Sequence, residues 1–394
     1  MAPKRPRGLK AAADAKADGK KQKTEDAKDG AEPKTVMLDA DVEEDDELSE
    51  LQAIYQSAVQ KLDSNPTEAL ALLRGAIHES DRMLRNWEGD VSPPPTFHLV
   101  YGSALLDMGQ LVQNEEPGPY YEAALERLEA GLESLSEVKG DETEKESVSV
   151  TKIHIQLAKT LLTQLQAMAS LSTDKKPSPK TIETSQKQIE DAKGHVQKAL
   201  EMPFGSSPAD VSFFSTLPQI LLLFSDVADL MDGLVDLDSQ IPFYTFALDS
   251  LGQLQTKKVE LTDDALAIGK MCLAQANAYL AEDDQAEDDQ EEDDEDEEEA
   301  TDAPHATETI AVLEKGLGAL KVTTTNMTVD FYATRAELAI NLGNFRDETD
   351  QEILYKEAVE DIKRIQAIDA EKGEKSLPEG LESFLQDWEE STEA

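Results

Sequence analysis

The residues of this chain that could do chemistry are five histidines, one cysteine and many carboxylates. No histidine lies in a His-Glu-x-x-His pair or beside cysteine at zinc-site spacing, and no His-x-Asp of an iron dioxygenase occurs. Glycine-rich phosphate loops and the Gly-x-Ser-x-Gly nucleophile turn are also absent from the sequence. We therefore predict a protein that is not an enzyme and that holds no metal or cofactor. The histidines are His78, His98, His154, His195 and His305.

The cysteine and a glycine pair lie inside apolar helical patterns, where packing is the simplest interpretation. We expect Cys272 to be a buried structural thiol, and Gly316-Leu317-Gly318 to mark a tight contact between helices. A single cysteine excludes an internal disulfide framework and fits a reducing compartment.

The charge balance of the 394 residues is strongly acidic, with 83 acidic against 37 basic residues and a formal net charge of −46. Phosphates would be repelled over most of such a surface, so we expect no direct nucleic-acid binding. The longest apolar candidate, residues 218–237, contains four aspartates, and the basic start leads into no apolar segment. We therefore expect no membrane span and no secretory signal. We also expect the protein to be a monomer.

The first 23 residues differ from the rest of the chain because their net charge is +6. Two basic clusters, separated by twelve residues, have the form of a bipartite nuclear import signal read by an importin. The alternative is a generic basic arm. The composition predicts a disordered tail over residues 1–47, which ends in an acidic patch starting at Asp39. The cluster residues are Lys4, Arg5, Arg7, Lys20, Lys21 and Lys23.

A second extreme of charge is the run 282–299, which holds fifteen acids and no base. Like charges repel, so we expect a disordered acidic loop over 282–303 that packs against nothing. The alternative is a tract that binds histones or ribosomal proteins.

The body of the chain, residues 48–394, is expected to be a single all-α protein-binding domain. Leu, Ala, Glu, Gln and Lys dominate, apolar residues recur at i, i+3/i+4, and prolines and glycines mostly separate these segments. About six helix pairs predict an irregular tetratricopeptide-like α-solenoid, the alternative being a helical array without that ancestry. The expected pairs are 48–62 with 67–87, 96–112 with 120–135, 147–171 with 181–202, 208–230 with 241–254, 262–281 with 307–320, and 327–342 with 349–368, followed by a cap helix at 381–388.

One expected helix, 147–171, contains no acid although the body is acidic. Its basic residues are Lys152, His154 and Lys159. We predict that they form a strip that attracts an acidic segment of a partner. The alternative is that the lysines form exposed salt bridges with neighbouring acids.

The opening Lys4-Arg5-Pro6-Arg7-Gly8-Leu9, the acidic patch, the helical body and the late acidic run together resemble the fungal enhancer of translation termination family. That family includes the fission-yeast negative regulator of an oxygen-sensing prolyl hydroxylase. The resemblance implies a non-catalytic adaptor in the nucleus that binds a 2-oxoglutarate- and iron-dependent prolyl hydroxylase and influences translation termination. It also implies a link to a small-subunit ribosomal protein. The alternative is an acidic chaperone for basic nuclear or ribosomal proteins.

The import signal can be tested by changing Lys4, Arg5, Lys20 and Lys21 to alanine in a fluorescent fusion. We expect the fusion to lose its nuclear accumulation, because an importin groove needs both basic clusters. Unchanged accumulation in live-cell images would contradict the prediction.

Overall fold

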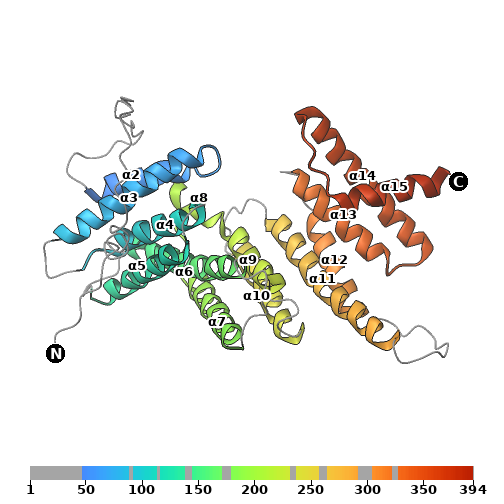
Figure 1. Ribbon diagram of the computed structural model, residues 1–394, viewed down its shortest axis with the longest axis horizontal. Helices are drawn as coiled ribbons and strands as arrows, with labels where there is room; N and C mark the ends of the chain where they lie inside the picture. The colour runs from blue at the N-terminus through green and yellow to red at the C-terminus, as the bar shows by residue number, and fades with distance from the viewer. Residues whose placement is uncertain are drawn as a thin grey trace, which may run out of the picture. The chain divides into compact units, whose positions relative to one another are not determined.

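The chain folds into α-helices throughout the part that the structure, a computed structural model, describes (Figure 1). The described residues are 47–87, 92–112, 116–137, 144–170, 179–230, 237–256, 264–291, 304–321 and 327–393. All of them belong to the compact unit Val42–Ala394, and none of them lies in a β-strand. The predicted all-α fold is confirmed for these residues.

Short connections separate the helices. In chain order they are α2 (Glu47–Val59), α3 (Pro66–Asn86), α4 (Pro95–Leu111), α5 (Gly118–Glu137), α6 (Glu144–Ser170), α7 (Pro179–Glu201), α8 (Pro208–Phe214), α9 (Leu217–Leu230), α10 (Leu237–Thr256), α11 (Asp264–Glu291), α12 (Ala306–Lys321), α13 (Val329–Gly343), α14 (Glu348–Lys372) and α15 (Glu379–Glu393).

Successive helices pack as the six predicted pairs, which are α2 with α3, α4 with α5, α6 with α7, α9 with α10, α11 with α12, and α13 with α14. The pairs share their apolar cores with their neighbours. Helix α11, for example, places Met271 in a cluster with α6 to α10 and Leu273 in a cluster with α12 to α15. Because each layer is buried by the next one, the array is an α-solenoid, as the sequence predicts.

Prolines and side-chain caps set several helix starts. Ser207 and Asp210 form a reciprocal capping box ahead of α8. The helix expected over 96–112 begins one residue earlier, at Pro95. The fixed φ of proline suits the first helical position, and the Thr96 hydroxyl lies 3.2 Å from that of Ser149.

The apolar segment expected as one helix over 208–230 is two helices, α8 and α9. The hydroxyls of Ser215 and Thr216 each donate to a backbone carbonyl three residues back, at 2.7 Å. Pro218 then lacks the N–H that would continue α8. The break is therefore a local hydrogen-bonding effect that apolar periodicity does not reveal.

One stretch of the described residues, 208–228, has the length and composition to cross a membrane. Half of it is buried, and Phe214, Leu217 and Leu221 lie in the core shared with α6 and α10. An apolar helix at the centre of a core has the same composition. The expectation that the chain has no membrane span stays a prediction.

The start of the acidic run is helical, and one of its acids packs, where the sequence analysis expected a loop without packing. Helix α11 continues to Glu291, ten residues beyond its expected end. Asp283 is only 4% exposed, and its carboxylate accepts the backbone N–H of His305 at 3.2 Å, just before α12. A carboxylate is favourable at a helix start, because it accepts hydrogen bonds from the unpaired backbone N–H groups and interacts with the positive end of the helix dipole. Since α11 continues through residue 282, the expected loop start there is wrong. The rest of that loop, 292–303, lies outside the described residues.

Helices α4 and α5 approach closely because glycines on α4 face large side chains on α5. A Cβ on Gly102 would lie 2.5 Å from Cγ of Leu128, and a Cβ on Gly109 would lie 2.6 Å from Cε1 of Tyr121. Both distances are below any normal carbon contact. The small and large residues of this pair therefore fix how far apart the two helices lie.

The packing expected around the cysteine is confirmed at one of the two glycines. A Cβ on Gly316 would lie 2.8 Å from Cβ of Cys272, whereas Gly318 has nothing within 4 Å. Cys272 is fully buried, and burial raises the pKa of its thiol to about 12. A thiol of this kind stays protonated and packs as a small apolar side chain.

Three histidines of the described chain lie inside the helical packing. Nδ1 of His154, on α6, lies 2.9 Å from Nδ1 of His195, on α7. Burial lowers the pKa of His98 and of His154 to about 4, helped for His98 by the charge of Arg127 and for His154 by His195 and Lys198. Burial also lowers the pKa of His195.

The glycine contacts lead to a paired prediction. Gly102→Ala should lower the free energy of unfolding by about 1–3 kcal/mol, because the new methyl group overpacks the α4–α5 contact. On α10, a methyl group added at Gly252 would enter open space. Gly252→Ala should therefore raise the free energy of unfolding by about 0.5–1 kcal/mol, because alanine has the higher helix propensity. Thermal and urea unfolding of both variants measures the two effects. A stabilised Gly102→Ala would show that the α4–α5 approach is not tight.

The buried histidines predict a loss of stability in acid. Between pH about 6.5 and about 4 the unfolded imidazoles take up protons that the folded ones do not, so stability falls as the pH falls. His154→Asn should reduce this fall by about 1–3 kcal/mol, whereas His78→Gln, at an exposed histidine of α3, should not. Chemical unfolding at pH 7.5 and pH 4.5 tests this, and equal slopes for wild type and His154→Asn would contradict it.

Candidate partner-binding site

The predicted basic strip lies on α6, a helix that packs against several others. Helix α6 contacts α4, α5, α7 and α9, and most of its residues from Val148 to Leu165 are buried. A buried helix cannot carry unpaired carboxylates at acceptable cost. The absence of acids from residues 147–170 of this helix therefore agrees with their burial.

Lys152 is held inside the described chain by one acid and two aromatic rings. Its Nζ lies 2.5 Å from Oδ1 of Asp210, and both side chains are largely shielded from solvent. The same Nζ lies 5.3 Å from the ring centre of Phe213 and 5.8 Å from that of Phe214. Lys152 thus joins α6 to α8.

The other two residues of the strip are also engaged within the chain. His154 is 7% exposed and pairs with His195. Nζ of Lys159 lies 3.7 Å from Oδ1 of Asp107 on α4. The lysines do pair with acids, as the alternative reading held, but the pairs are sheltered and not exposed. A partner-binding role of Lys152, His154 and Lys159 stays a prediction.

Buried carboxylates join the helix pairs at two further points. Asp107, 3% exposed, accepts a hydrogen bond at 2.8 Å from the hydroxyl of Tyr55 on α2. Burial and this neighbouring carboxylate raise the pKa of Tyr55 well above its usual value. Between α13 and α14, Asp361 receives a bidentate ion pair from Arg335 and a bond at 3.2 Å from Arg364.

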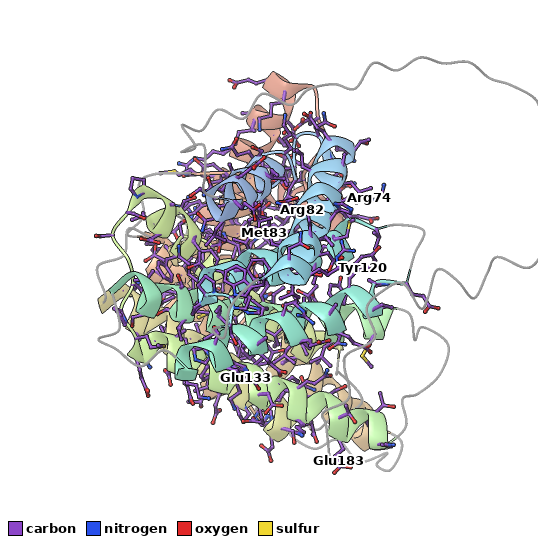
Figure 2. All side chains as sticks on the ribbon, turned by 90° about the vertical axis from the view of Figure 1, so that its left-hand side faces the viewer. Arg74, Arg82, Met83, Tyr120, Glu133 and Glu183 are labelled. Atoms are coloured by element: carbon purple, nitrogen blue, oxygen red, sulfur yellow. The ribbon has the colours of Figure 1, made fainter. Side chains whose placement is uncertain are left out.

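The outer face of α3 is a feature that the sequence analysis missed. Helical spacing places Thr67, Ala71, Arg74, His78 and Arg85 on one stripe, and all five are exposed. We call these five residues the α3 stripe. Figure 2 shows Arg74 pointing out from α3. The available signal was that three of the chain's nine arginines, at 74, 82 and 85, lie within twelve residues.

The predicted import residues, Lys4 to Lys23, lie outside the described residues. Within the described part, no cluster of three or more histidine, cysteine or acidic side chains is arranged to hold a metal ion.

Comparison with known proteins identifies the family. The family model described as "Nuclear pore complex subunit Nro1" matches residues 1–240. The chain is 34% identical over 153 residues to "Enhancer of translation termination 1" of Meyerozyma guilliermondii, over 37% of this chain and 35% of the relative. It is 37% identical over 101 residues to "Negative regulator of ofd1" of Schizosaccharomyces pombe, over 23% of this chain and 25% of the relative. The matches thus span about a quarter to a third of these relatives.

Solved structures show the same fold over most of the chain. The Schizosaccharomyces pombe nuclear import adaptor Nro1 superposes with a TM-score of 0.57 at 19% identity, over 87% of this chain and 98% of that one. A second structure, titled "The hypoxic regulator of sterol synthesis Nro1 is a nuclear import adaptor", gives a TM-score of 0.54 at 20% identity, over 86% and 93%. The resemblance stated from sequence is confirmed, and the expected nuclear localisation agrees with the family's description. The chain belongs to the Nro1 family.

Proposed function

We propose that this chain is a non-catalytic nuclear adaptor that binds a 2-oxoglutarate- and iron-dependent prolyl hydroxylase and influences translation termination. The observation that carries the proposal is membership of a family whose relatives are named for translation termination, for regulation of ofd1 and for nuclear import. In this proposal the basic clusters of the tail bind an importin, and the helical unit binds the hydroxylase. A small-subunit ribosomal protein is a further proposed partner.

The architecture supports an adaptor. A helical array exposes a long, rigid surface while each helix pair is held by its neighbours, so surface residues can serve binding without disturbing a central core. The charged residues that are largely buried, such as Lys152 and Asp361, form ion pairs that join one helix to another. The surface residues remain available for a partner.

The second candidate is an acidic chaperone for basic nuclear or ribosomal proteins, and the net charge of −46 favours it. The two candidates differ in their response to salt. Charge-driven binding weakens strongly when the Debye length shortens, whereas an interface anchored by apolar contacts does not.

Two measurements test the proposed function. Titration of the purified chain with the hydroxylase of the same organism should give a dissociation constant that changes less than about tenfold between about 50 mM and 500 mM salt. In cells, the fluorescent hydroxylase should leave the nucleus when the adaptor carries the four alanines at Lys4, Arg5, Lys20 and Lys21. Binding that disappears in high salt would favour the chaperone, and a hydroxylase that stays nuclear would exclude the import role.

A further inference from the structure

We propose that the α3 stripe binds an acidic segment of a protein partner. The proposal rests on the proposed adaptor function in one respect, which is that an adaptor needs a surface that binds a partner. It is a claim about charge and geometry on one helix, so it can be tested with neither the hydroxylase nor an importin present.

The first argument is the distribution of arginine in an acidic protein. Seven arginines lie in the unit Val42–Ala394, and α3 holds three of them. The guanidinium group forms bidentate hydrogen bonds with carboxylates and is always charged at neutral pH. A concentration of this side chain on one helix suits the recognition of carboxylates.

The second argument is that the acids of α3 already have partners. Glu68 lies 3.2 Å from Nζ of Lys61, and Glu79 accepts two hydrogen bonds from Nε of Arg82, at 2.9 and 3.0 Å. Asp81, the acid closest to the stripe, accepts the hydroxyl hydrogen of the buried Tyr101 at 2.6 Å. The ion pairs neutralise Glu68 and Glu79, whereas the hydrogen bond from Tyr101 only holds the half-buried Asp81 in place. Arg74 and Arg85 outnumber this one carboxylate, so the outer face of α3 is basic.

The third argument is that Arg74 has no ion-pair partner among the described residues, in contrast to the sheltered lysines of α6. Among the described residues, the one hydrogen bond that Arg85 donates, at the other end of the stripe, is to the backbone carbonyl of Asp81, at 3.1 Å. His78 lies between them on the same face, and the exposed Ala71 and Thr67 leave the surface low beside them. The stripe therefore offers two guanidinium groups and an imidazole to a ligand.

The dimensions fit a short extended peptide. Arg74 and Arg85 are eleven residues apart, which is about 16 Å along a helix. An extended chain of about five residues covers that distance. Trp87, which follows α3, is 38% exposed and packs against Phe97 with the ring centres 6.1 Å apart. Its indole offers a large apolar contact to a residue that flanks the acidic segment.

Charge favours a peptide over a nucleic acid as the occupant. A long nucleic acid would extend past the few basic groups of the stripe. Its phosphates would then be repelled by the rest of the chain, whose net charge is −46. A short acidic segment feels mostly the local groups, because the Debye length at physiological salt is about 8 Å.

Fluorescence anisotropy of the full chain tests the proposal with two labelled probes at about 150 mM salt. One probe is a peptide of about six residues, made of Asp, Glu and a single Leu, which matches the length of the stripe, and the other is a single-stranded DNA of equal length. We expect the peptide to bind more tightly than the DNA. The double variant Arg74→Glu with Arg85→Glu should weaken peptide binding by at least about tenfold.

The matched control is Lys187→Glu with Lys198→Glu on α7. These two exposed lysines are also eleven residues apart, and neither has an ion pair among the described residues. The control should change peptide affinity by less than about twofold, since it alters the net charge equally but lies elsewhere. Should the α3 variant melt early, Arg74→Gln with Arg85→Gln replaces it. Equal weakening by both doubles, absence of peptide binding, or tighter binding of the DNA would each overturn the proposal.

Discussion

Close approach of helices at glycine is the constraint on which the arrangement of this chain depends. On α4 and α5, Gly102 faces Leu128 and Gly109 faces Tyr121. The two glycines are seven residues apart, and so are their partners, in the opposite chain direction. Two such contacts fix the antiparallel register of the pair as well as its spacing, because a shift along the helix would bring a side chain against a side chain. Gly343 and Tyr355 repeat the contact between α13 and α14.

Buried charges then join one helix to another across this apolar framework. Asp107 binds Tyr55 of α2 and Lys159 of α6, and Lys152 of α6 binds Asp210 of α8. Removing one member of such a group leaves an uncompensated charge in the interior, which costs more than the complete group contributes. The ionic contacts therefore make the packing specific, whereas burial of apolar side chains provides most of the favourable free energy.

Which charged side chains have partners inside the protein also determines which charges are left on its surface. Lys152 and Lys159 of α6 are largely shielded from solvent, and each has an acidic partner on another helix. On α3 the acids are the residues with partners, and Arg74 and Arg85 face outward. A helix with three acids can therefore present a basic face, while the acid-free stretch 147–170 of α6 is mostly buried. Because of this difference, the α3 stripe is the candidate surface for the partner that the proposed adaptor function requires.

The sequence by itself determined the helical fold, the six pairs, the burial of Cys272 and the family. These follow from local information, because apolar periodicity, proline positions and small residues act within one helix or between adjacent ones. Tertiary structure alone decided the burial of Asp283 and whether each charged side chain of the described residues is buried or exposed. Lys152 finds its partner 58 residues away and Lys159 finds its partner 52 residues away. A charge is exposed or buried according to the helix that covers it, and no pattern within a single helix contains that information.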